Sequence, residues 1–208
     1  MTVACGKLAA TLLAAASAAA AAEAVRYEIR ESEVSRLELT VVKTGLLAGK
    51  KHLFVFERYR GTVFFDAKSP EASQVSFCIA AHSAVCRDTW VSAKDLRKIQ
   101  EFALKDMLAA DQHPDITFSS VSIRQIGSGR YEVLGNLAIR GRSRPARVEV
   151  ALEVQEGGGT LAITGSSVIR MKDYGLKPPS AALGTIGTKD EMSFTFRLTG
   201  RRATGMGA

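Results

Sequence analysis

Residues 115–154 have the sequence DITFSSVSIRQIGSGRYEVLGNLAIRGRSRPARVEVALEV, and the rest of the 208-residue chain is organised around them. Alternating apolar residues stop at turn-forming groups at 127–129 and 141–145, so the pattern predicts three strands joined by two tight turns. One face of these strands is apolar, with members Ile116, Phe118, Val133, Leu137, Ile139, Val148, Val150, Leu152 and Val154. Such a face must be covered by protein or by a ligand.

Further strands are expected on both sides of this region. Before it, the pattern predicts a loop at 43–51, a turn near Arg60–Gly61, and strands at 25–29, 34–42, 52–56, 63–65 and 75–79. After it, strands are predicted at 161–170 and 192–198, with a long loop at 175–187 between them. About eight or nine antiparallel, locally connected strands suit a small closed barrel, and closure leaves no exposed edges.

Only one segment, near residues 92–110, has helical spacing. Ser92 and Asp95 form a start that resembles a capping box. Apolar residues then recur every three or four positions, at Leu96, Ile99, Phe102, Ala103 and Met107. The simplest interpretation is an amphipathic helix that acts as a lid or plug over one end of the barrel. The alternative is a helix that lies on a membrane, because its exposed face is basic.

Residues 1–22 have the layout of a secretory signal peptide. Lys7 is their only charge, and an apolar run and an alanine tract follow it up to a small-residue cleavage site at Ala20-Ala21-Ala22. We therefore expect export to the periplasm and a single domain over residues 23–208. An alanine-rich helix that stays attached and a retained membrane anchor are the alternatives.

The chain is basic, with 28 Lys and Arg against 21 Asp and Glu, a formal net charge of +7. This balance favours anionic surfaces such as phospholipid head groups. A nucleic-acid partner is not expected, because the aromatic residues are not interleaved with the basic ones. Two cysteines follow the leader, Cys78 and Cys86, which could form a disulfide or stay as buried thiols.

Enzymatic and metal-binding patterns do not accompany the three histidines, His52, His82 and His113. His82 and Cys86 have a spacing that would suit a metal pair on a helix, but they fall at the end of a predicted strand. We therefore predict no catalytic residue and no metal site. Arg87 and Asp88 are expected to form a local ion pair in a loop.

Five blocks of the sequence resemble, in order, the signature of the YceI-like family. They are Gly45–Leu47 followed by His52, Gly61–Asp66, His113–Ser120, Gly135–Gly141 and Ile169–Gly175. The resemblance spans the chain from about Tyr27 to Leu198, with departures at Leu53 and Ala138, where the family usually has aspartate and threonine. It implies a periplasmic, lipocalin-like, eight-stranded antiparallel barrel that encloses a polyisoprenoid, as in isoprenoid quinones.

The ligand site that the resemblance implies is an apolar cavity inside the barrel. Its expected lining is Phe54, Phe56, Phe65, Phe77, Ile79, Phe102, Met107, Ile116, Phe118, Leu137, Ile139, Ile169, Phe194 and Phe196. Contacts to a lipid head group or a membrane are assigned to His52, Arg87, Arg142 and Arg144. No cofactor is expected beyond a bound isoprenoid lipid or quinone. The same apolar residues could instead merely fill the core.

Two functions from different classes follow. The first is an exported lipid-binding protein that sequesters or transports a polyprenyl lipid or isoprenoid quinone. The alternative is a ligand-free envelope module that docks on membranes or partners through its basic rim. An enzyme built on the same barrel ranks third, and the oligomeric state stays open, a homodimer included.

Overall fold

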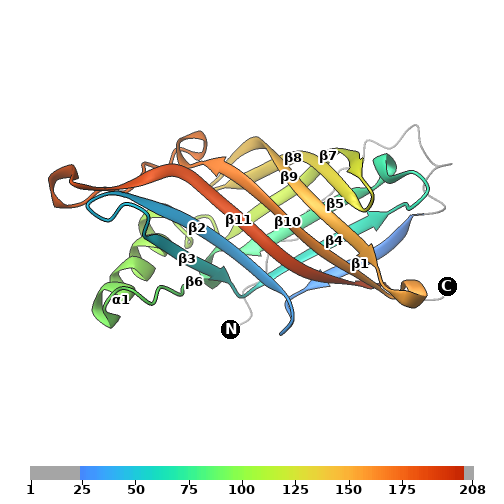
Figure 1. The fold of residues 1–208 in the computed structure, drawn as a ribbon, viewed down its shortest axis with the longest axis horizontal. Helices are drawn as coiled ribbons and strands as arrows, with labels where there is room; N and C mark the ends of the chain where they lie inside the picture. The colour runs from blue at the N-terminus through green and yellow to red at the C-terminus, as the bar shows by residue number, and fades with distance from the viewer. Residues whose placement is uncertain (1–23, 204–208) are drawn as a thin grey trace.

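One antiparallel sheet of eleven strands contains almost all of the regular structure in this computed structural model, which describes residues 24–203 (Figure 1). The strands are β1 (Val25–Arg30), β2 (Arg36–Gly45), β3 (Lys51–Phe56), β4 (Tyr59–Phe65), β5 (Gln74–Ala80), β6 (Ala84–Cys86), β7 (Asp115–Gly127), β8 (Arg130–Ile139), β9 (Arg142–Val154), β10 (Thr160–Arg170) and β11 (Ile186–Arg202). Helix α1 (Ala93–Phe102) continues into the π-helical segment η3 (Ala103–Met107). The predicted leader lies outside the described residues.

The sheet closes into an eight-stranded barrel, as predicted, because six of the short strands are halves of three longer ones. The longer strands are β1 with β2, β3 with β4, and β5 with β6. In one half of the barrel β1 pairs with β4 and β4 with β5, and in the other half β2 pairs with β3 and β3 with β6. β11 closes the barrel by pairing with β10 on one side and with both β2 and β1 on the other, for example Phe194 with Leu39 and Gly200 with Ile29.

The predicted turn near Arg60–Gly61 is wrong, because both residues lie inside β4. The chain bends at 57–58 instead, between β3 and β4. Gly61 pairs with Phe77 of β5, and a Cβ at Gly61 would lie 2.4 Å from the Phe77 ring. The glycine therefore serves the close approach of an aromatic ring within a strand.

The meander at 115–154 forms β7, β8 and β9, and its predicted apolar face points into the barrel. The turn between β8 and β9 is shorter than predicted. It consists of Arg140 and Gly141, with φ of 51° and 71°, as in a two-residue hairpin turn. Residues 142–145 belong to β9, because each of them lies opposite a residue of β8, up to Arg142 opposite Ile139.

The predicted helix covers one end of the barrel (Figure 1). Ser92 caps it, since its hydroxyl accepts a hydrogen bond from the Asp95 N–H at 3.1 Å. Gln100 then joins the helix to the free edge of β6: its side-chain amide donates to the Ala84 carbonyl and accepts from the Cys86 N–H, both at 2.6 Å. Among the residues that the structure describes, no helix is long and apolar enough to cross a membrane.

Candidate functional site

Two cavities lie inside the barrel that residues 24–203 form. The first, which we call the strand-walled cavity, has a volume of about 140 Å³ and lies among the inward faces of the strands. Its walls are Ile29, Leu37, Val63, Phe65, Pro70, Ser73, Val75, Phe77, Ile79, Phe118, Ile123, Tyr131, Val133, Leu137, Val148, Val150, Leu152, Ile163, Ser167, Phe194, Phe196 and Leu198. Several of these side chains face inward yet stay only partly buried, so the interior is incompletely filled.

The strand-walled cavity offers almost no hydrogen-bonding groups. Besides the Tyr131 hydroxyl, its polar side chains are two serines that are already engaged: the Ser167 hydroxyl donates to the Arg147 carbonyl at 2.7 Å, and Ser73 accepts from the Asp66 N–H at 3.0 Å. Any ligand there must be apolar, because a polar group without a partner loses its hydration without compensation.

Interior glycines shape this cavity by letting aromatic rings lie close to the wall. A Cβ on Gly135 would lie 2.4 Å from the Phe118 ring, and a Cβ on Gly165 would lie 2.4 Å from the Phe196 ring. Phenylalanines that cover glycines on neighbouring strands are a known device for curving a barrel wall. The glycines thus give the rings space that a side chain at either position would occupy.

The second cavity, which we call the helix-side cavity, lies beneath α1 and η3 and has a volume of about 310 Å³. Its walls are Leu39, Val41, Lys43, His52, Phe54, Phe56, Ala84, Lys98, Ile99, Phe102, Ala103, Met107, Leu108, Met171, Leu176, Pro179, Thr188 and Met192. The polar groups of this wall are basic or hydroxylic, and no aspartate or glutamate is among them.

Lys43 is the most unusual residue of the helix-side cavity. It follows Leu37, Leu39 and Val41 at alternate positions of β2, so it points into the barrel, and it is 9% exposed. Its ammonium lies 3.2 Å from the Thr188 hydroxyl, and within the described residues it forms no ion pair with a carboxylate. Burial lowers the pKa of Lys43, because the charged amine has lost its hydration.

His52 is held on the same wall by a fixed set of contacts. Its Nδ1 lies 2.5 Å from a carboxylate oxygen of Asp88, whose other oxygen accepts from the Leu53 N–H at 2.8 Å. The Trp90 ring stacks on the imidazole with centroids 5.3 Å apart. A buried carboxylate that holds Nδ1 fixes the orientation of the imidazole ring.

The predicted ion pair between Arg87 and Asp88 is wrong, because these neighbours point to different partners. Arg87 pairs with Glu57 at 2.5 Å on the outer surface, whereas the Asp88 side chain is buried behind His52. Arg87 is therefore directed away from the cavity.

A packed band separates the two cavities. The rings of Phe56, which lines the helix-side cavity, and Phe194, which lines the strand-walled cavity, stack with centroids 6.2 Å apart. Ile116, Ile139 and Ile169, which were expected in the cavity lining, are packed in the core and line neither cavity. They face the interior as predicted, but neighbouring side chains cover them.

The other predicted lining residues divide between the cavities. Phe65, Phe77, Ile79, Phe118, Leu137, Phe194 and Phe196 lie at the strand-walled cavity, and Phe54, Phe56, Phe102 and Met107 lie at the helix-side cavity. Sequence reasoning missed Lys43 and Thr188. For Lys43 a signal existed, because the apolar alternation of the preceding strand places it on the inward face.

Arg142 and Arg144 lie against the segment that follows β10. Arg144 Nε donates to the Asp173 carbonyl at 3.1 Å. The Arg142 guanidinium carbon lies 2.5 Å from the position that a Cβ on Gly175 would take. Gly175 has a left-handed φ of 70°, so both its conformation and its contact with Arg142 favour glycine. Both arginines therefore have a local structural contact.

Cys78 and Cys86 are separate, buried thiols, so the disulfide that the sequence allowed is not formed. Burial raises the pKa of Cys86 to about 11. His82 Nε2 lies 3.2 Å from Asp111 Oδ1 near the surface. Over residues 24–203 the structure shows no group of three or more His, Cys, Asp or Glu side chains placed to hold a metal ion.

Two known proteins are similar to this chain in sequence. A UPF0312 protein of Azotobacter vinelandii is 28% identical over 59% of this chain, and the match covers 62% of that relative. A UPF0312 protein of Pseudomonas syringae pv. tomato is 24% identical over 63% of this chain and 67% of its own length.

Two solved structures have a similar fold. Burkholderia cenocepacia BcnA has a TM-score of 0.60 at 21% identity, covering 81% of this chain and 96% of BcnA. A Campylobacter jejuni YCEI protein has a TM-score of 0.56 at 17% identity, covering 72% of this chain and 84% of its own. The family model of the YceI-like domain matches residues 27–199, which are nearly the whole barrel. The chain therefore belongs to the YceI-like domain family.

Proposed function

We propose that this protein is an exported carrier that sequesters or transports an isoprenoid-type lipid in the periplasm. The observation that supports it most is the strand-walled cavity, whose inward apolar side chains are only partly buried and whose serine hydroxyls are already hydrogen-bonded. Family membership and the barrel fold are consistent with a lipid-binding role. Carriage requires no chemical step of the protein.

The apolar and polar parts of the ligand bind in different cavities. The prenyl tail occupies the strand-walled cavity, where burial of its apolar surface contributes about 25 cal/mol per Å² before ordering costs. The head group occupies the helix-side cavity beside Lys43 and His52. Quinone carbonyl oxygens only accept hydrogen bonds, so they suit the Lys43 ammonium, which donates one hydrogen bond to the Thr188 hydroxyl.

A long tail must pass the Phe56–Phe194 pair to reach from one cavity into the other. The proposal therefore includes a displacement of these rings when a long ligand binds. Only a prenyl chain short enough to stay beside its head group in the helix-side cavity would leave the rings in place.

Native mass spectrometry of protein purified from its own cell envelope tests the proposal. We expect a bound species of several hundred daltons that organic extraction removes. Added isoprenoid quinones should then raise the melting temperature of the extracted protein. If extraction yields no lipid and quinones leave the melting temperature unchanged, the carrier function is wrong.

The head-group assignment has its own variant. Lys43→Met keeps the length of the side chain and removes the ammonium, so it should weaken quinone binding about tenfold while a prenyl alkane still binds. Lys94→Met, at an exposed position of α1, is the matched control and should bind quinone as the wild type does. Equal binding by all three proteins would place the head group elsewhere.

A further inference from the structure

Two leucines are largely exposed to solvent at the end of the barrel that holds the helix-side cavity. Leu46, in the turn between β2 and β3, is 79% exposed, and Leu183, in the loop before β11, is 106% exposed. Their loops are in contact, because the Leu46 N–H donates to the Thr185 carbonyl at 3.0 Å. We call the two segments, 45–51 and 181–185, the leucine tip.

The backbone of the leucine tip is built to project Leu183. Ala182 and Leu183 both adopt left-handed conformations, with φ of 49° and 53°, and Gly184 follows with φ of 87°. Non-glycine residues avoid this region because the Cβ crowds the backbone. Hydrogen bonds from Ala181 N–H to Ile186 O at 2.8 Å and from Thr185 Oγ1 to Ala182 O at 2.8 Å hold the loop closed. Strain maintained in this way clusters at functional positions.

The two chain segments that carry the leucine tip have only basic charges, and Asp173 and Asp190 directly flank the second of them. Segments 43–51 and 174–189 contain no aspartate or glutamate. Their exposed charges are Lys50, Lys51, Lys177 and Lys189. Exposed leucines within a group of lysines are the pattern of a surface that inserts apolar side chains among lipids while its charges meet anionic head groups.

The leucine tip lies beside the helix-side cavity. Lys43, Pro179 and Thr188, which lie two or three residues from the segments of the tip, line the helix-side cavity. Phe102 of α1, which is 41% exposed, lines it from the other side. In Figure 1 the turn between β2 and β3, the start of β11 and helix α1 all lie at one end of the barrel, opposite the C-terminus.

We propose that the leucine tip docks on an anionic lipid bilayer and brings the helix-side cavity to face it. Leu46 and Leu183 enter the head-group region, and the four exposed lysines contact lipid phosphates. This surface differs from Arg142 and Arg144, which contact the backbone after β10. Docking is independent of carriage: a protein that binds quinone in solution but binds no vesicle would keep the proposed function and lose this one.

Vesicle flotation tests the docking. The protein without residues 1–22 is mixed with two kinds of vesicle. One is phosphatidylcholine alone, and the other also contains about a third phosphatidylglycerol. We expect binding to the anionic vesicles, weaker binding to the neutral ones, and a loss of binding as salt rises. No binding to anionic vesicles would overturn the proposal, and a tip-dependent dimer in light scattering would assign the surface to a second copy instead.

Matched variants separate the tip from the rest of the surface. Leu46→Ser with Leu183→Ser should lower vesicle affinity at least about tenfold, because each leucine loses its burial in lipid. Val121→Ser with Val168→Ser changes two exposed apolar residues on the barrel wall and should leave affinity unchanged. Equal losses in both pairs, or none in the leucine pair, would contradict the assignment.

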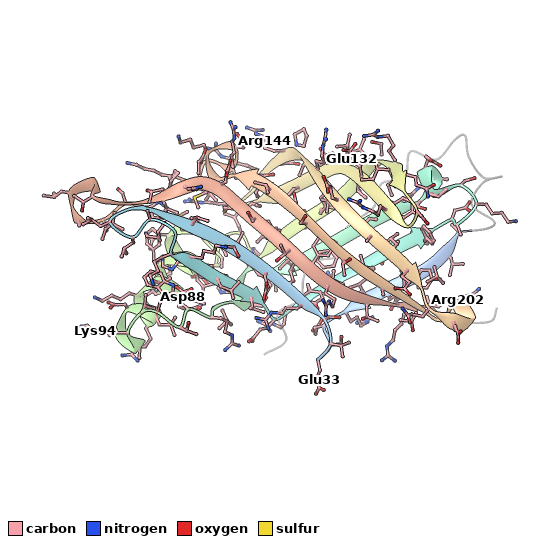
Figure 2. All side chains as sticks on the ribbon, viewed as in Figure 1. Glu33, Asp88, Lys94, Glu132, Arg144 and Arg202 are labelled. Carbon is pink, nitrogen blue, oxygen red and sulfur yellow. The ribbon has the colours of Figure 1, made fainter. Side chains whose placement is uncertain are left out.

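Charge variants test the contribution of the lysines to vesicle binding. Lys50→Glu with Lys177→Glu should abolish the preference for anionic vesicles. Arg201→Glu with Arg202→Glu makes the same charge change at the opposite end, where Figure 2 labels Arg202, and should retain that preference. Circular dichroism of each variant shows whether the barrel is folded, so a loss of binding can be assigned to the surface.

Discussion

The ring of Phe56 stacks on the ring of Phe194, and each ring faces a different cavity. The two residues come from β3 and β11, which are neither consecutive in the chain nor paired with each other. Both strands pair with β2, one on each side of it, so the two rings meet over β2 on the inner face of the barrel wall. Their contact sets the boundary between an apolar cavity and one with basic groups.

Phe194→Ala should lower the free energy of unfolding by about 3–5 kcal/mol, because a buried aromatic side chain is replaced by a void. Urea denaturation measures the change. Phe64→Ala is the control, since Phe64 lies on the outer surface and is half-exposed, and it should cost about 1 kcal/mol or less. Similar losses for the two variants would show that the stacked pair is not part of the packed core.

Gly165→Ala should destabilise the barrel by about 1–3 kcal/mol through overpacking. Its Cβ would lie 2.4 Å from the Phe196 ring and 2.5 Å from the Glu149 carbonyl oxygen, and the latter is backbone and cannot turn away. Gly159→Ala is the control, because no atom lies within 4 Å of its added Cβ. Thermal denaturation should separate the two variants clearly.

Cys86 should make the protein lose stability between pH 9 and pH 11. Burial raises the pKa of its thiol from 9.0 to about 11, so in this window the unfolded chain releases a proton that the folded chain keeps. The free energy of unfolding then falls by about 1 kcal/mol per pH unit. Cys86→Ala lacks this contribution, and urea midpoints of both proteins at pH 8, 9, 10 and 11 should diverge only above pH 9.

Glu132→Gln should be less stable than the wild type at pH 7 and equally stable in acid. Glu132 lies between Arg124 and Arg147, 2.8 Å from each, and the hydrogen bond from Arg124 lowers the pKa of its carboxyl below the ordinary 4.5. The stabilisation is present above pH 4.5 and is lost as the pH falls through the lowered pKa.

The measurement for Glu132 is the free energy of unfolding of both proteins from pH 7 to pH 3. Glu153→Gln, at an exposed position of β9, supplies the matched control. A constant difference between wild type and Glu132→Gln at every pH would mean that the network acts through packing and not through charge.

Local alternation predicted the meander well because it is a property of consecutive residues. Val148, Val150 and Leu152 alternate with Glu149, Ala151 and Glu153, and each of the three apolar side chains points into the barrel as the pattern requires. The capped helix was equally visible, since the cap at Ser92 and the spacing of Ile99 and Phe102 depend only on nearby sequence.

The contacts that shape the cavities depend on residues far apart in the chain, and this explains what the sequence could not show. Gly61 is a residue type that is common in turns, but it lies within a strand, where the Phe77 ring of β5 occupies the space of a side chain. Arg87 and Asp88 are neighbours, yet strand geometry sends them to Glu57 and His52. The exposure of Leu183 follows from a left-handed backbone that no local apolar pattern indicates.

One part of the barrel wall is joined by a side chain and not by a strand ladder. Among the described strands β6 pairs with β3 alone, and Gln100 completes its other edge with two hydrogen bonds. A change of rotamer at one residue would release both bonds and leave every strand pair intact. The barrel thus has a seam beside the helix-side cavity, and its width can vary there while the fold as a whole stays closed.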